Sequence, residues 1–199
     1  MNKIDIIKNS KPPKILYHYT TADGLLGILN SKSIWATHVS YVNDRQEFVY
    51  LLDILRAVMR DEEYPELVKF YEIVEAVHND LIKANFTVTS FSEAPDLLSQ
   101  WRAYSSSSLG YCIGFNTESM MQRQKFYQCV YDTKLQRDLV TALMENLAKD
   151  LMKYPEEERG QHLSDFMPEF LTDYIILALF MKHPSFEEEK EWRMLYNPA

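Results

Sequence analysis

The sequence predicts a single α+β domain with a curved or split mixed sheet packed by helices, and three observations lead to this fold class. The chain has 199 residues, 46% of them hydrophobic and 13% aromatic, which is enough to fill one ordinary core. Segments with a period of two alternate with segments of helical period, without the regular β-α-β repeat of a doubly wound sheet. No repeat or Gly/Pro-rich linker interrupts the chain, so the predicted domain spans residues 14–199, after an irregular arm at 1–13 that ends in a proline pair.

The first half of the chain predicts two strands and three helices. The strands are short β-branched and aromatic segments, whereas the helices place apolar residues on one face. Thr20 or Thr21 is expected to cap the first helix. The third helix is expected to begin at Pro65, since proline suits a first helical turn. The second and third helices are expected to form a hairpin. In order, the elements are strand 15–19, helix 21–30, strand 33–39, helix 45–60 and helix 65–81.

The second half predicts four more strands and two long helices. Thr133 is expected to cap the first of these helices, and Gln136, three residues later, is expected to complete a capping box with it. The serine run 105–108 predicts a loop between a short helix and the strand "YCIGF". In order, the elements are strand 86–92, strand 111–115, strand 126–132, helix 133–151, helix 165–182 and strand 192–196.

Composition and motifs exclude several classes of function. The formal charge of −8 argues against nucleic-acid binding by bulk electrostatics, although a local basic groove stays open. The longest apolar run, 174–181, is far shorter than the roughly 20 residues of a membrane-spanning helix, so no membrane partner is expected. Two cysteines without a C-x-x-C spacing and no secretory leader predict a reduced, cytoplasmic chain. Five scattered histidines predict no metal site, and neither a G-x-S-x-G elbow nor a P-loop is present.

His18 occupies an unusual position for a structural residue. Alternation along the strand 15–19 places Leu16 and His18 on one face and Ile15, Tyr17 and Tyr19 on the other. If the first face meets the core, the imidazole needs a hydrogen-bond partner there. Two interpretations remain open: a satisfied core histidine, or a histidine that contacts a ligand in a cleft together with Ser92.

The acidic run near the end of the chain, "FEEEKEWRML", also has two interpretations. A run of this kind is commonly a solvated face. Glu189 and Glu191, however, are two residues apart and immediately precede an apolar strand. In extended geometry both carboxylates would point the same way, at the mouth of a sheet.

Six ordered motifs span most of the chain. They are "YHYT" at 17–20, "ND-x-x-E" at 43–47, "SFS" at 90–92, "QWRAYS" at 100–105, "GYCIGF" at 110–115 and "E-x-EWR" at 189–193. In order and spacing, these motifs together resemble a bacterial family, the domain of unknown function 2971. The layout also resembles the ADP-ribosyltransferase superfamily, in which a first-strand His or Arg, a middle Ser or Tyr and a late Glu surround NAD.

This second resemblance implies an ADP-ribosyltransferase-like fold and NAD as substrate. Breaking the bond between ribose and nicotinamide builds positive charge at the anomeric carbon, which a fixed carboxylate stabilises. Glu191 would be that carboxylate and Glu189 its accessory, while His18 would clamp a ribose. The remaining candidate contacts to the nucleotide are Tyr19, Asn43, Ser90 and Ser92 for hydroxyl groups, Trp101 and Tyr104 for ring stacking, and Arg102 and Arg193 for phosphate oxygens.

Each of these roles has a structural alternative. Trp101 and Trp192 are more readily explained as core aromatic residues than as stacking platforms, and Arg102 is also explained as the partner of Glu93 or Asp96. Asn43 and Asp44 suit a turn and helix cap. The middle motif is Ser-Phe-Ser where the superfamily pattern has Ser-Thr-Ser.

Two functional hypotheses follow. The first is an NAD-binding ADP-ribosyltransferase-like enzyme, or an NAD glycohydrolase, of a toxin or phage-defence system. Its acceptor could be protein or nucleic acid. The second is a non-catalytic binding module of the same fold. An enzyme requires His18, the "SFS" strand and Glu191 to converge on one cleft, whereas a binding module does not. The sequence defines neither the acceptor nor an oligomeric state.

Overall fold

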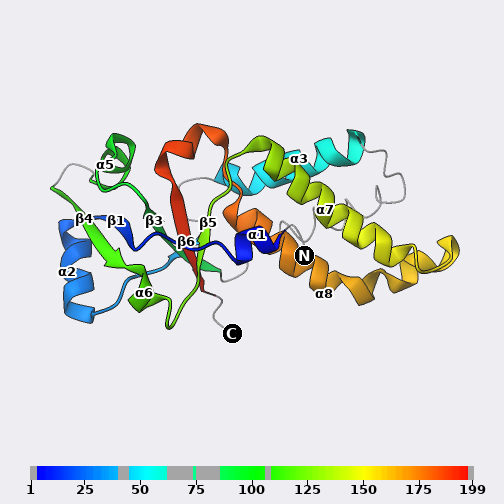
Figure 1. The fold of residues 1–199 in the computed structure, drawn as a ribbon, viewed down its shortest axis with the longest axis horizontal. Helices are drawn as coiled ribbons and strands as arrows, with labels where there is room; N and C mark the ends of the chain where they lie inside the picture. Colours follow the sequence, from blue (N-terminus) through cyan, green and yellow to red (C-terminus); the bar gives the residue numbers. More distant parts are fainter. Residues whose placement is uncertain (1–3, 40–44, 62–73, 75–85, 106–108, 197–199) are drawn as a thin grey trace. The chain divides into compact units, whose positions relative to one another are not determined.

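The computed structural model describes residues 4–39, 45–61, 74, 86–105 and 109–196 of the chain (Figure 1). It forms two compact units, and each unit is assembled from three separate segments. The boundaries of a single domain at 14–199 stay a prediction. The first unit comprises Met1–Lys8, Asn43–Ala84 and Val130–Pro184, and the second comprises Asn9–Val42, Asn85–Cys129 and Ser185–Ala199.

The second unit is built on a six-stranded sheet, which together with the helices confirms the α+β class. The path through the sheet is β4-β1-β3-β6-β5, and β2 pairs with β3 off this path. All of these pairings are antiparallel, so the prediction of a mixed sheet is wrong. The strands are β1 (Ile15–Thr21), β2 (Thr37–His38), β3 (Thr87–Ser92), β4 (Gly110–Asn116), β5 (Phe126–Gln128) and β6 (Glu191–Tyr196).

The sheet forks at one edge of β3. β1 pairs with the end of β3 at Ser92, whereas β2 pairs with its beginning at Thr87 and Val88. Ser90 lies between these two pairings. β1 and β2 therefore pair with different parts of the same edge of β3, within one sheet.

An apolar cluster covers one face of this sheet. Three short helices, α2 (Ala22–Ser31), α5 (Leu98–Tyr104) and α6 (Thr117–Met120), contact β1 or β4 in the same unit. Thr21 caps α2 by accepting a hydrogen bond from the Gly24 N–H at 3.2 Å, as the sequence predicts. The buried members of the cluster are Leu16, Phe91, Phe126, Trp192 and Met194.

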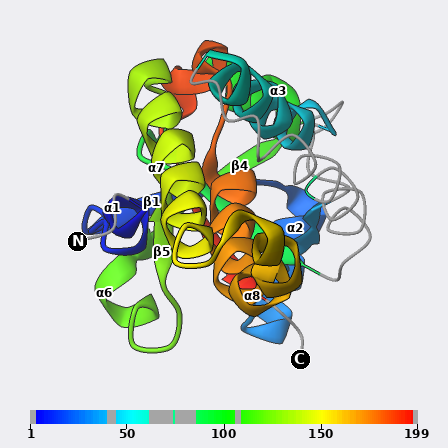
Figure 2. The same cartoon turned by 90° about the vertical axis from the view of Figure 1, so that its right-hand side faces the viewer.

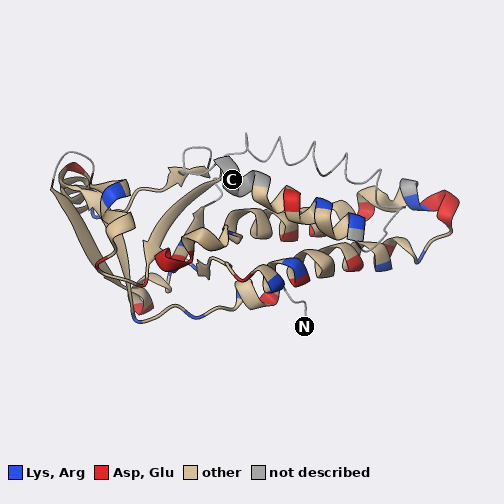
Figure 3. Ribbon diagram, turned by 90° about the horizontal axis from the view of Figure 1, so that it is seen from above, with Lys and Arg blue, Asp and Glu red and all other residues tan. Residues whose placement is uncertain are grey.

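The first unit is helical among its described residues. α7 (Thr133–Leu151) lies beside α8 (Glu156–Phe180), and α3 (Arg45–Asp61) contacts both (Figures 1 and 2). Acidic and basic residues are interspersed along the long helices (Figure 3). The segment α1 (Asp5–Lys8) adds a short helix that the sequence predicts as irregular. Burial of Ile4 and Ile7 holds this segment in place, together with a 2.7 Å ion pair between Lys8 and Asp173.

Three predicted elements differ in extent. Of the strand predicted at 33–39, only β2 is present in the structure. Trp35, in the part that is not a strand, is 76% exposed and is therefore not covered by the sheet. The strand at 126–132 stops at Gln128, after which Val130 forms a single parallel bridge with Met181. The helix predicted at 165–182 begins at Glu156, because three glutamates after Pro155 suit a first turn. The helix predicted at 65–81 lies almost entirely outside the described residues, so its hairpin with the helix predicted at 45–60 is also not described.

The cap of α7 also differs by one residue. The Asp132 carboxylate accepts from the Leu135 N–H at 2.6 Å, so Thr133 is the first helical residue and not the cap. Gln136 is fully buried and has a different role. Its amide nitrogen donates to the carbonyls of Val130 and Lys182, at 2.6 and 2.7 Å, and its amide oxygen accepts from the Tyr50 hydroxyl at 2.7 Å.

Candidate functional site

Three of the sequence motifs lie on three adjacent strands of the sheet. β1 carries "YHYT", β3 carries "SFS" and β6 carries "E-x-EWR". The register aligns Tyr17 with Ser92, and Ser92 with Glu191. The chain therefore brings together residues that are up to 174 positions apart in a single row across the sheet.

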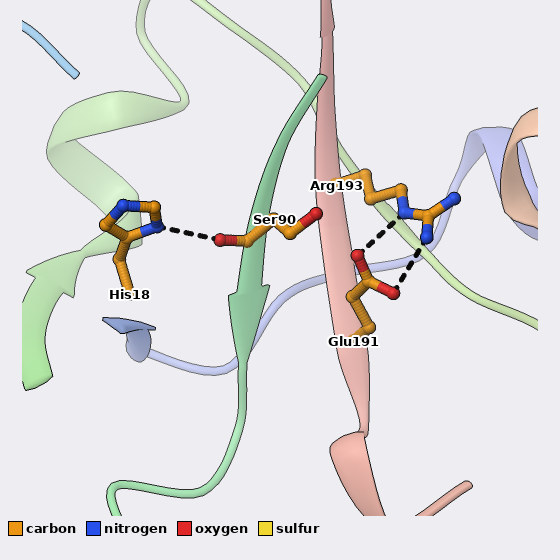
Figure 4. A network of polar contacts seen from close by, with 4 residues as sticks. All are labelled: His18, Ser90, Glu191 and Arg193. Carbon is orange, nitrogen blue, oxygen red and sulfur yellow. Dashed lines mark hydrogen bonds and ion pairs between the residues drawn. The ribbon is translucent and has the colours of Figure 1, made fainter. Parts of the chain in front are cut away.

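His18 lies at the fork, where its ring faces the backbone of β3 (Figure 4). Its Nδ1 is 2.9 Å from the Ser90 carbonyl oxygen. Because a carbonyl only accepts, Nδ1 carries the hydrogen, and the neutral ring keeps an acceptor lone pair on Nε2. Nε2 has no hydrogen-bond partner in the described part of the chain. Burial lowers the pKa of His18 from 6.5, partly offset by the bond to Ser90, so the ring is neutral at neutral pH.

Glu191 forms a closed pair with Arg193 on the same strand (Figure 4). The Arg193 Nε donates to Oε1 at 2.7 Å, and its second terminal nitrogen donates to Oε2 at 3.0 Å. The two residues are only 5% and 3% exposed. Both carboxylate oxygens are therefore engaged in a bidentate, charge-assisted contact with little access for another molecule.

His18 and Glu191 point to opposite faces of the sheet. His18 shares the face of the apolar cluster, where its ring centroid lies 5.7 Å from that of Phe91. Trp192 pairs with Phe91 and belongs to the same cluster, so Glu191 and Arg193 project from the other face. The convergence of His18 and Glu191 on one cleft, which an enzyme of the proposed class requires, is not seen.

The residues around Glu191 have structural contacts. Ser92 is buried: its hydroxyl donates to the Glu189 carbonyl at 2.7 Å and accepts from the Ala94 N–H at 3.1 Å, so it does not line a cleft as predicted. Glu189 ends a 3-10 helix, Pro184–Glu189, and Lys190 follows in a left-handed conformation with φ of 42°. This kink breaks the alternation that would have aimed Glu189 and Glu191 in one direction.

Tyr19 anchors the segment that follows β3. Its hydroxyl donates to the Ala94 carbonyl at 2.7 Å and accepts from the Leu97 N–H at 3.0 Å. Trp101 packs edge-on against its ring, with centroids 4.8 Å apart. Burial is the largest cause that raises the pKa of Tyr19 to about 12, and burial also raises the pKa of the neighbouring Cys112 thiol. Both groups stay protonated at neutral pH, which suits neither for nucleophilic attack.

The predicted partners of Arg102 are engaged elsewhere. Glu93 accepts from the indole N–H of Trp192 at 2.9 Å, and Asp96 accepts from that of Trp101 at 2.7 Å. Arg102 is exposed and has no ion pair among the described residues. Tyr104 is 37% exposed, and Asn43 lies outside the described residues.

Sequence reasoning missed the pairing within "EWR" and the two indole-carboxylate bonds. A signal for the first was available, because opposite charges two residues apart on a strand share a face. The indole bonds join residues that are 5 and 99 positions apart, and the longer of the two depends on the register between β3 and β6.

The site has one feature suited to a ligand and none suited to a metal. The neutral His18 ring can accept a hydrogen bond from a hydroxyl group through Nε2. Among the described residues, no group of three or more His, Cys, Asp or Glu side chains could hold a metal ion. In the same part of the chain, no helix has both the length and the apolar character to cross a membrane.

These features define the class of protein as an α+β protein with a forked antiparallel sheet and a polar row across its three middle strands. A family model described as "Protein of unknown function (DUF2971)" matches residues 100–194, just under half of the chain. This match supports the family resemblance, and it covers the motifs "QWRAYS", "GYCIGF" and "E-x-EWR". Comparison with curated proteins and with solved structures returns no match.

Proposed function

We propose that this chain is a nucleotide-binding module with an ADP-ribosyltransferase-like fold, which holds NAD without cleaving it. The contrast between two motif residues carries the proposal. His18 offers an unused acceptor on a ring fixed by Ser90, whereas the Glu191 carboxylate is closed by Arg193. Binding of a ribose hydroxyl needs the first group, and stabilisation of a developing cation needs an accessible second group.

NAD as the ligand is supported by the resemblance of the motif layout and by the neighbouring positions of the three motif strands. In this arrangement the ribose hydroxyl donates to His18 Nε2. Trp101, Tyr104 and Arg102 lie on α5, in or next to the motif "QWRAYS", where partly exposed rings and a cation suit a nucleotide.

Calorimetric titration with NAD tests the binding role. His18→Asn keeps a donor for the Ser90 carbonyl but removes the Nε2 acceptor, so it should weaken NAD binding roughly fivefold, the scale of one net hydrogen bond of about 1 kcal/mol. His162→Asn, a histidine of the other unit, is the matched control and should leave the affinity unchanged. Absence of NAD binding by the wild type contradicts the proposal.

The second candidate is an NAD-consuming ADP-ribosyltransferase of a toxin or phage-defence system that acts on a protein or nucleic acid. The row from Tyr17 through Ser92 to Glu191 favours it, since the late glutamate lies beside the middle motif. Nicotinamide release distinguishes the candidates. The binding module predicts no release by the wild type. Release that falls roughly 10²-fold in Glu191→Gln, with the variant still folded, would establish the enzyme instead.

A further inference from the structure

A cavity of ≈ 550 Å³ lies in the second unit. The end of α2, the segment after it, α6 and the turn that follows, and the ends of β4 and β6 form its walls. Its volume falls within the range of about 300–1,000 Å³ that is typical of small-molecule sites. None of the residues proposed to contact NAD lines it.

The floor of the cavity is apolar and belongs to the core of the unit. Met194 is 1% exposed and is a member of the apolar cluster. Ile34, Phe115, Met120 and Tyr196 are half-buried and pack against that cluster. A floor continuous with a packed core is held in shape before any ligand arrives, which reduces the ordering cost of binding.

The rim of the cavity carries positive charge. Lys32 and Arg123 both line the cavity and both are exposed. Neither has an ion-pair partner among the described residues, and no Asp or Glu lines the cavity. In a chain of net charge −8, two uncompensated cations over an apolar floor favour an anionic group on the ligand.

The backbone fixes the place of Lys32 at the rim. Lys32 caps the end of α2 in the left-handed region, with φ of 54° and ψ of 31°. Glycine or asparagine takes this position most easily, and a lysine costs free energy there. Attraction to the end of the helix dipole accounts for a lysine at this point. Arg123 follows a different helix, α6, so the two cations reach the rim from two separate segments.

We propose that this cavity binds a small organic anion with an apolar body, such as an aryl sulfonate, carboxylate or phosphate ester. The apolar body would occupy the floor formed by Phe115, Met120 and Met194. The anionic group would lie at the rim, between Lys32 and Arg123. This site is separate from the proposed NAD site, so the two proposals succeed or fail independently.

Fluorescence titration with 8-anilinonaphthalene-1-sulfonate tests the proposal, because this probe combines an aromatic body with one sulfonate. We expect saturable binding of one molecule per chain. Lys32→Gln and Arg123→Gln should each weaken it about threefold, the scale of an exposed ion pair, and the double variant should weaken it roughly tenfold. Lys125→Gln is the matched control, since Lys125 is exposed and close in sequence but does not line the cavity.

The uncharged analogue N-phenyl-1-naphthylamine separates charge recognition from apolar binding. Its affinity should be the same in the wild type and in both Gln variants, and added salt should weaken only the sulfonate probe. Thermal melting confirms that each variant is folded. Sulfonate binding that is unaffected by the double variant, or that occurs at many weak sites, overturns the proposal.

Discussion

At the fork of the sheet, the His18 ring makes a hydrogen bond to β3 that a neighbouring strand would otherwise make. Its Nδ1–H donates to the carbonyl of Ser90, which lies between the pairings of β1 and β2 with β3. A side chain that completes backbone pairing is a structural role. The same bond also selects the tautomer that leaves Nε2 as an acceptor, so the structural role and the proposed ligand role are compatible.

Acid should weaken the fold through His18. Its pKa in the folded chain is lowered from 6.5, so the unfolded chain binds more protons, and stability rises with pH. The stability that the neutral His18 ring contributes is fully present above pH 6.5 and is lost as the pH falls through the pKa of the folded chain. Within that window the free energy of unfolding should change by up to about 1.4 kcal/mol per pH unit. Urea unfolding from about pH 8 to about pH 5 measures it.

His18→Asn is the comparison that isolates this effect, since it removes the titrating group and keeps a donor. Its free energy of unfolding should depend less on pH than that of the wild type. Parallel curves for the two proteins would assign the pH dependence to other groups.

One buried amide, that of Gln136, connects the start of α7 to three other segments. Gln136 bonds the carbonyl of Val130, just before the helix, and that of Lys182, just after α8, and it accepts from Tyr50 on α3. A glutamine amide has two donors and one acceptor oxygen, and each of these three contacts uses one of them. The tie joins segments of the first unit that are far apart in the chain.

Gln136→Met should destabilise the protein by roughly 3 kcal/mol, because it removes the three hydrogen bonds of a fully buried amide at nearly constant volume. Urea unfolding followed by far-ultraviolet circular dichroism measures the change. The control is Gln161→Met on α8, an exposed position, which should stay within about 0.5 kcal/mol of the wild type. Equal stability of the two variants would contradict the structural role of the amide.

Helical and strand periods predict the limits of several elements well. α3, α7, β3, β4 and β6 all start and end within two residues of their predicted limits. Local sequence signals predict the wrong structure where tertiary packing determines the conformation. Trp35 is an example: its aromatic side chain favours a strand, but it is exposed and packs against no sheet. At the site, alternation predicts the face of His18, and it could also have predicted the Glu191–Arg193 pair, since residues two apart on a strand share a face. It does not predict the direction of Glu189, because the kink at Lys190 interrupts simple alternation.

The two units of the whole molecule are interleaved along the chain. Each consists of three segments, so the chain passes between the units five times. While one unit is folded, it holds the ends of the other unit's segments at fixed separations. When it unfolds, these connections become long flexible loops whose closure costs entropy. Each unit should therefore stabilise the other through the chain itself.

We expect the two units to unfold in a single transition. The three tryptophans, Trp35, Trp101 and Trp192, all lie in the second unit, whereas the long helices α3, α7 and α8 lie in the first. Tryptophan fluorescence and circular dichroism therefore follow different units in the same urea titration. Coincident curves are the expected result. Two separated transitions would show that the units fold independently despite the five passages.

The position of β6 in the sheet has a consequence for synthesis on the ribosome. β6 pairs with β3 and with β5, yet it is made after both of them. Translation of residues 129–196 takes roughly 3 to 14 s at about 5–20 residues per second. During that time the edges that β6 will occupy have no strand partner, and such edges promote aggregation. The nascent chain should therefore depend on chaperone protection until its last strand emerges.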